Sequence, residues 1–211
     1  MIGVIVAMKS EMRHLIKEIK LTVKHKIDGI DFYLGTIFCK DVVLAVSGVG
    51  KVNAARCTTI MGLAFNVKSI INIGFAGAVG FPVGSVVFIT QFRLLDVDTS
   101  ALGDKAGLFF GTNETTLKPD IKAFQKLNYC LFTGCCFTSD RFINTKIRNI
   151  LTKNYVVDME CGAIAHVCYF NKIKFIAIKI VSDNLNVKHY KEFNKKENRK
   201  KFSEIIKECI K

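Results

Sequence analysis

The hydrophobic residues of this chain fall into short continuous runs, and most of these runs end at a glycine-rich or polar turn. Residues 2–7, 69–73 and 174–181 are almost wholly apolar, which is typical of strands buried on both faces of a sheet. Residues 30–38 and 41–47 predict two more strands, joined as a hairpin. Segments with helical spacing follow several of these runs, so the pattern predicts an α/β fold.

The helical segments carry apolar residues three and four positions apart. Ser10 is the predicted N-cap of a first helix that continues to Ile19. This cap places Glu11 in the first turn of the helix. Residues 52–65 predict an alanine-rich helix, and a buried helix is expected after Glu160. The remaining expectations are strands at residues 85–90, 129–137 and 155–157, a glycine- and alanine-rich loop at 74–80, and a surface loop at 99–119.

Length and composition favour one domain that spans residues 1–211, half of which are hydrophobic. No apolar run approaches the length of a transmembrane helix, and the N-terminal run lacks the features of a signal peptide. The eight cysteines form no CxxC pair, and Asp96 and Asp98 have metal-like spacing without a third ligand cluster. We therefore expect a cytoplasmic protein with reduced, mostly buried thiols, no metal site and no membrane association.

The formal net charge of +13 suggests an anionic partner, nucleic acid above all. The excess is spread along the chain and concentrates only between residues 188 and 211, where lysines are mixed with glutamates. Phe193, Phe202, Ile205 and Ile206 interrupt these charges at helical spacing. An amphipathic helix with a solvated face explains this pattern better than a nucleic-acid surface does.

The glycine turn at residues 47–51 resembles a phosphate-binding loop but matches neither common motif. A P-loop would need glycine in place of Ala45 and a hydroxyl residue in place of Val52. The dinucleotide motif would need a third glycine in place of Asn53. We expect only a tight turn at the start of a helix, where polar ligands are readily held.

Carboxylates follow three of the strand-like runs. Glu11 comes after the first run, Glu160 after residues 155–157, and Asp183 after the last. Ligands of open α/β sheets collect beyond the carboxyl ends of the strands, so these side chains predict a shared cleft. For Asp158 and Glu160 a simpler interpretation is open, since carboxylates also favour helix N-termini.

An ordered set of motifs gives the chain a specific resemblance. It resembles the 5′-methylthioadenosine/S-adenosylhomocysteine nucleosidases of the purine nucleoside phosphorylase–like superfamily. The motifs, from residue 2 to about 184, are IGVIVAM with Glu11, SGVGKVNAA (47–55), INIGFAG (71–77), DVD (96–98), SDRFI (139–143), ME with AIAH (159–166) and Ser182-Asp183.

The resemblance implies a three-layer α/β fold with a central mixed, twisted sheet flanked by helices, and a cytosolic homodimer. It implies hydrolysis of the N-glycosidic bond of a thio-substituted adenine nucleoside, without a metal or an organic cofactor. Glu11 would activate the attacking water, Asp183 would protonate purine N7, and Glu160 would hold the ribose hydroxyls. The other residues that the resemblance assigns to substrate binding are Ala7, Met8, Val49, Phe75, Ala76, Gly77, Phe142, Ile143, Asp158, Met159, Lys179 and Ser182.

These residue types suit the chemistry. Glycosidic cleavage builds positive charge on the sugar and negative charge on the departing purine. A protonated Asp183, desolvated in the pocket, would neutralise the purine, while Glu11 needs room for water on the other side of the sugar. The negative charge of Glu160 would favour the cationic sugar of the transition state.

The chain departs from the family pattern at several places. Phe75 stands where the family usually has Ser, and Lys179 where it has Arg. Leu95 replaces a His, Asp158 replaces a Glu, and the loop after Asp98 is altered. Lys179 keeps the positive charge of Arg but lacks its planar guanidinium group, which forms bidentate hydrogen bonds. The bulky side chain of Phe75 either narrows the 5′ side of the pocket or repacks.

Three alternatives remain at this point. A phosphate-dependent nucleoside phosphorylase on the same fold would need an anion site, which Glu11 opposes. Another adenine nucleoside, such as 5′-deoxyadenosine or an aminofutalosine, is a second option. The third is a catalytically impaired member that acts as a basic binding surface.

Overall fold

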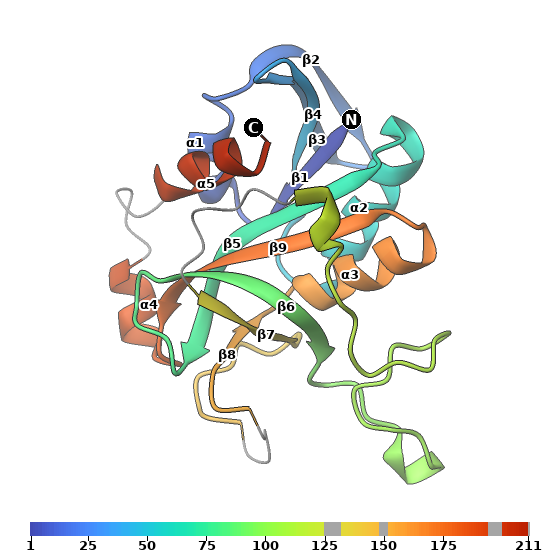
Figure 1. Cartoon of the computed structure of the whole chain (residues 1–211), viewed down its shortest axis with the longest axis vertical. Coiled ribbons are helices and arrows are strands. Elements are labelled where there is room, and N and C mark those ends of the chain that lie inside the picture. The colour runs from blue at the N-terminus through green and yellow to red at the C-terminus, as the bar shows by residue number, and fades with distance from the viewer. Residues whose placement is uncertain (125–131, 148–151, 194–199, 211) are drawn as a thin grey trace.

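The computed structural model describes residues 1–124, 132–147, 152–193 and 200–210, and these residues form a nine-stranded sheet flanked by helices (Figure 1). The strands are β1 (Ile2–Val6), β2 (Lys20–Ile27), β3 (Ile30–Ile37), β4 (Lys40–Val46), β5 (Ser69–Val79), β6 (Val86–Leu94), β7 (Phe132–Thr138), β8 (Tyr155–Asp158) and β9 (Lys174–Asp183). The helices are α1 (Lys9–Leu15), α2 (Lys51–Phe65), α3 (Cys161–Phe170), α4 (Val187–Phe193) and α5 (Lys200–Ile210), with 3-10 turns η1 (Ser100–Leu102) and η2 (Ile121–Phe124).

The strands follow the order β2-β3-β4-β1-β5-β8-β7-β6-β9, and β5 also pairs with β9. Because β9 pairs with both β5 and β6, the five strands from β5 to β9 close into a ring. Parallel pairs join β1 to β4 and β5, while β3 pairs antiparallel with β2 and β4. The predicted mixed sheet flanked by helices is confirmed.

The central strands bury both of their faces because their side chains alternate between two apolar layers. In β1, Ile5 faces the layer that α2 and α3 cover, whereas Val4 and Val6 face the layer of α1 and α5. In β9, Ala177 faces the layer of α2 and α3, and Ile178 faces the layer of α1 and α5. The pair α2 and α3 and the pair α1 and α5 therefore lie on opposite faces of the sheet, and α4 lies beside β9 (Figure 1).

Several predicted boundaries were wrong. Residues 74–79 belong to β5 rather than to a loop, because they pair with β8 and β9 as the ring closes. Helix α1 has Met8, not Ser10, as its N-cap and ends at Leu15. Strand β2 was missed, since its side chains are almost all exposed and it carries no continuous apolar run.

Other predictions hold with changes. The 30–47 hairpin is confirmed, and the 99–119 segment is mostly irregular but is anchored by the buried side chains of Phe109 and Leu117. Residues 129–131 of a predicted strand lie outside the described residues, and the described remainder begins at Phe132. The C-terminal region forms α4 and α5, and α5 is amphipathic as predicted, because it buries Phe202, Ile205 and Ile206 while Lys200 and Glu204 are exposed.

The seven described cysteines are free thiols, and five of them are buried, as expected. No helix among the described residues is long and apolar enough to cross a membrane.

Candidate active site

A pocket opens where β1, β5, β8 and β9 end, and all of the predicted site residues line it. Residues brought together from distant parts of the sequence are Ala7, Met8, Glu11, Val49, Phe75, Ala76, Gly77, Phe142, Ile143, Asp158, Met159, Glu160, Lys179, Ser182 and Asp183. Their individual roles stay predictions, but their common location follows from the parallel arrangement of β1, β5 and β9.

Glu11 lies in the first turn of α1 and points into the pocket, with 1% of its surface exposed. Its Oε2 accepts hydrogen bonds from the N–H groups of Ala7 (3.1 Å) and Met8 (2.9 Å). Its Oε1 accepts one from the N–H of Phe75 at 3.2 Å. Burial raises the pKa of Glu11 above its usual value, although these donors and the Lys179 charge oppose the rise. A carboxyl so held suits a proton acceptor.

Asp183 is the last residue of β9, lines the same pocket and is 1% exposed. A β-bulge pairs Ala76 with Val181 but Gly77 with Asp183, and such bulges re-aim side chains at functional sites. The Oδ1 of Asp183 accepts the N–H of Asn186 at 3.0 Å, and its Oδ2 lies 2.8 Å from the Ser182 hydroxyl.

Glu160 is the N-cap residue of α3, and its Oε1 accepts the N–H of Gly50 at 3.0 Å. Burial, together with the negative charge of Asp158, raises the pKa of Glu160 to about 7, while Lys179 and the Gly50 N–H act in the opposite direction. The glycine turn therefore has a defined contact: Gly50 has a φ of 96°, a conformation that favours glycine, and its N–H meets the carboxylate.

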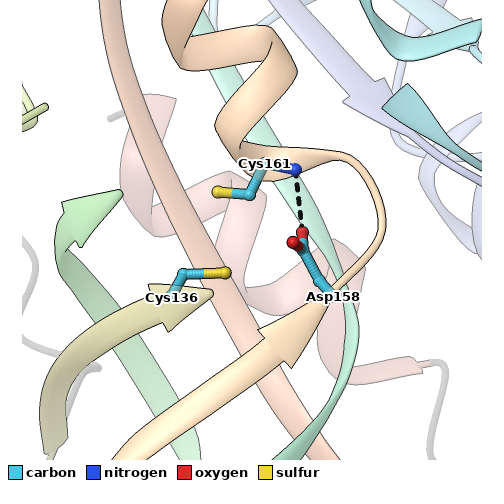
Figure 2. Close-up of side chains that lie close together, drawn as sticks. All are labelled: Cys136, Asp158 and Cys161. Carbon is cyan, nitrogen blue, oxygen red and sulfur yellow. Dashed lines mark hydrogen bonds between the residues drawn. The ribbon is translucent and has the colours of Figure 1, made fainter. Parts of the chain in front are cut away.

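Asp158 differs from Glu160 because protein donors engage both of its oxygens. Oδ1 accepts the Thr138 hydroxyl at 2.6 Å, and Oδ2 accepts the N–H of Cys161 at 2.9 Å. Figure 2 shows this carboxylate at the end of β8, facing the first residue of α3. The capping interpretation is therefore correct for Asp158, which also lines the pocket.

The sulfurs of Cys136 and Cys161 lie close to Asp158 (Figure 2), and this trio is the one cluster with metal-ligand geometry among the residues that the structure describes. A metal ion would have to displace the donors to Asp158 and ionise thiols, but burial raises the pKa of Cys136 well above its usual value. Packing and hydrogen bonding account for this cluster better than metal binding does.

Lys179 is the buried cation of the site, with 1% of its surface exposed. Its Nζ lies 2.7 Å from Asp158 Oδ2 and donates to Asn72 Oδ1 at 2.6 Å. Burial alone would lower the pKa of Lys179, but the neighbouring Asp158 raises it above the usual value, so the ammonium remains charged. A Cβ on Gly74 would lie 3.3 Å from Glu11 Oε1 and 3.8 Å from this Nζ, which places the cation near Glu11.

Phe75 accommodates its bulk by packing towards the C-terminal helices. Its ring contacts Phe202 of α5 (centroids 4.8 Å apart) and Phe193 of α4 (5.7 Å). Its N–H still reaches Glu11. Of the two outcomes open for this substitution, repacking describes the ring better than a narrowed pocket, although Phe75 remains part of the lining.

Sequence reasoning missed several lining residues. Tyr190 of α4 packs its ring against Phe142 (5.5 Å between centroids), and its hydroxyl lies 3.9 Å from Met8 Sδ. Nothing in the basic C-terminal pattern distinguishes this tyrosine. Asn72 did carry a signal, since it is a polar residue between the apolar residues Ile71 and Ile73, and its amide also donates to the Ile5 carbonyl at 3.0 Å.

Comparisons with known proteins agree over the whole chain. The family model described as "Phosphorylase superfamily" matches residues 1–211. A 5′-methylthioadenosine/S-adenosylhomocysteine nucleosidase of Staphylococcus haemolyticus is 36% identical over 203 residues, covering 89% of this chain and 88% of the relative. The crystal structure of the Streptococcus pneumoniae MTA/SAH nucleosidase with 8-aminoadenine matches with a TM-score of 0.90 and 28% identity, covering 99% and 97% of the two chains. A second structure from S. pneumoniae, with the transition-state inhibitor MT-ImmA, has a TM-score of 0.89, with the same identity and coverage.

Proposed function

The chain belongs to the phosphorylase superfamily and, within it, to the 5′-methylthioadenosine/S-adenosylhomocysteine nucleosidases, and from this premise we propose how its pocket cleaves these two nucleosides. The enzyme is an N-glycosyl hydrolase that releases adenine from 5′-methylthioadenosine and S-adenosylhomocysteine. The resemblance carried by the sequence motifs is thereby confirmed.

The observation that best supports a hydrolytic mechanism is the pair of buried carboxyls that line one pocket, Glu11 from the first turn of α1 and Asp183 from the end of β9. Glu11 takes a proton from water as the water oxygen bonds to the anomeric carbon. The bond from that carbon to the purine nitrogen breaks, and its electron pair moves into the purine. Asp183 delivers a proton to N7, so that adenine leaves as a neutral molecule.

Glu160 acts on the sugar. Its Oε1 is fixed by the Gly50 N–H, and its remaining acceptor capacity faces the pocket for the ribose hydroxyls. The ionised form stabilises the cationic sugar of the transition state more than the neutral substrate, which is the condition for catalysis. A pKa of about 7 means that this form is gained as the pH rises through neutrality.

A phosphorylase is the second candidate, and the charges in the pocket disfavour it. The one buried cation described there, Lys179, is already bound to Asp158 and Asn72, and Glu11 would repel phosphate. Adenine release from 5′-methylthioadenosine should therefore be equally fast with and without inorganic phosphate. Strict dependence on phosphate would contradict the hydrolytic mechanism, and unchanged nucleoside under both conditions would favour a catalytically impaired protein.

The role assignments are tested by Glu11→Gln and Asp183→Asn, each of which we expect to lower kcat by at least about 100-fold. Asp31→Asn is the matched control, because Asp31 is a carboxylate of β3 that does not line the pocket. Circular dichroism checks that each variant is folded. Near-normal kcat in either pocket variant would refute its assigned role. Rates with 5′-deoxyadenosine and an aminofutalosine measure the preference for the 5′ substituent.

We also propose that the enzyme is a cytoplasmic homodimer. Apolar side chains on α2 and α3, which pack against each other, support this assembly: Val52 is 78% exposed, Leu63 77%, Tyr169 52% and Phe170 54%. Light scattering coupled to size exclusion should give twice the monomer mass. A monomer mass at all concentrations would contradict the proposal.

A further inference from the structure

Lys51 contacts residues next to two parts of the pocket, Glu160 and residues 141–143, that come from separate sequence motifs. It follows Gly50, whose N–H binds Glu160, and it begins α2. Its Nζ lies 2.5 Å from Asp96 Oδ1 and 3.5 Å from Asp140 Oδ2. The Lys51 side chain is only 19% exposed and that of Asp96 23%, so water screens this ion pair less than one on the open surface.

Asp140 is fastened through both its backbone and its side chain. Its Oδ1 accepts the Lys51 N–H at 2.8 Å, and its own N–H donates to Asp96 Oδ2, also at 2.8 Å. Burial raises the pKa of Asp96, but Lys51 and the Asp140 N–H more than offset this and lower it below the usual value. Asp96 is therefore a stable anion that links Lys51 to the backbone at residue 140.

The residues that immediately follow Asp140 are Arg141, Phe142 and Ile143, and all three line the pocket. They belong to residues 139–147, a described stretch after β7 that has no regular secondary structure. Such a segment is placed by individual hydrogen bonds rather than by a helix or a sheet ladder. The contacts of Asp140 with Lys51 and Asp96 therefore hold the backbone at the residue that directly precedes these pocket-lining residues.

We propose that Lys51, Asp96 and Asp140 form a clamp that positions the base-contacting segment 141–143 relative to the sugar-contacting Glu160. The inference rests on the proposed function and on the resemblance to the nucleosidases, which implies that Phe142 packs around the base and the sugar and that the Ile143 backbone meets the base. None of the three is a catalytic residue. Each acts through other groups: Lys51 and Asp96 through Asp140, and Asp140 through the segment that it begins.

A clamp of this kind contributes to binding and much less to chemistry. The base is held by the same segment in the substrate and in the transition state, so loosening the segment weakens both complexes alike. The variant Lys51→Met should raise KM for 5′-methylthioadenosine and the Kd of adenine by about 10-fold, as expected for loss of a partly buried, hydrogen-bonded ion pair, while kcat changes by less than about 3-fold.

The experiment compares the wild-type enzyme with Lys51→Met, Lys51→Arg, Asp96→Asn and the double variant Lys51→Met/Asp96→Asn. Initial rates give kcat and KM, and isothermal titration with adenine gives Kd without requiring turnover. Lys24→Met is the matched control, since it removes another lysine–aspartate pair, Lys24–Asp31 at 2.9 Å, outside the pocket.

The clamp predicts three results together. Lys51→Arg keeps KM and Kd within about 2-fold of wild type, the double variant is no worse than the more affected single variant, and Lys24→Met changes neither constant. Unchanged KM and Kd in Lys51→Met, even with a lower Tm, would show a purely structural role and overturn the inference. A loss confined to kcat, or an equal effect of Lys24→Met, would overturn it as well.

The proposed function fails in a different way. Wild-type enzyme that binds adenine but does not release it from nucleosides would refute hydrolysis and leave the clamp measurable through Kd. Wild-type protein that neither cleaves nucleosides nor binds adenine would refute both.

Discussion

Replacing Glu160 with Gln should make the protein more stable at pH 8 and change its stability much less near pH 4. Burial and the charge of Asp158 raise the pKa of Glu160 to about 7, compared with 4.5 for the unperturbed group. Between these values the folded state binds more protons than the unfolded state, so the free energy of unfolding falls as the pH rises. The loss is complete above pH 7 and amounts to about 3 kcal/mol, since each pKa unit is worth about 1.4 kcal/mol.

Glu160→Gln removes this penalty and keeps an oxygen that can accept the Gly50 N–H. For a chain of this size, about 3 kcal/mol corresponds to a Tm difference of roughly 6 to 12 °C. Differential scanning calorimetry of both proteins from pH 4 to pH 8 measures that difference. Glu11, whose pKa is also raised by burial, is present in both proteins, so the pH dependence that its burial causes is common to them. A Tm difference that stays constant with pH would refute the reasoning.

Three further variants test the buried polar and aromatic contacts. Lys179→Met leaves the Asp158 carboxylate buried without its cation and should lower the free energy of unfolding by roughly 3 to 5 kcal/mol, measured by urea denaturation at pH 7. Phe75→Ser opens a gap beside α5 and should lower the free energy of unfolding by about 2 to 4 kcal/mol. Its kcat should fall less than about 10-fold, because the backbone N–H to Glu11 is kept. A 100-fold loss of kcat would mean that the ring acts in the reaction. Gly77→Ala places a methyl group 3.2 Å from Asp183 Oδ1 and should lower kcat more than it raises KM. A variant with normal kcat would show that Asp183 tolerates displacement.

The strands of the central sheet could be predicted because their side chains are buried on both faces and leave a continuous apolar run in the sequence. Residues 74–79 could not, since glycine and alanine are weak strand formers and only pairing with β8 and β9 makes them extended. Strand β2 lies at the edge of the sheet and buries almost nothing, so tertiary pairing with β3 decides its conformation.

The candidate site likewise has features that the sequence pattern predicts and features that only tertiary packing decides. Glu11, Glu160 and Asp183 could be predicted because each follows a strand whose end faces the pocket. The ion pair of Lys179 could not, since a lysine within an apolar run gives no sign of its partner. Its partner Asp158 is 21 positions away in sequence and is brought near only by the packing of β8 and β9 around the ring.

Lys179 also explains how two buried carboxylates, Asp158 and Glu160, can lie two positions apart in different environments. Without a cation, Asp158 and Glu160 would repel each other, and one would stay protonated. The ammonium of Lys179 neutralises Asp158, whose oxygens are already occupied by Thr138 and Cys161. Burial and the charge of Asp158 raise the pKa of Glu160 to about 7, and Lys179 opposes this rise. The substitution of Lys for Arg therefore keeps a buried positive charge at this position, and Lys179 Nζ also donates a hydrogen bond to Asn72 Oδ1.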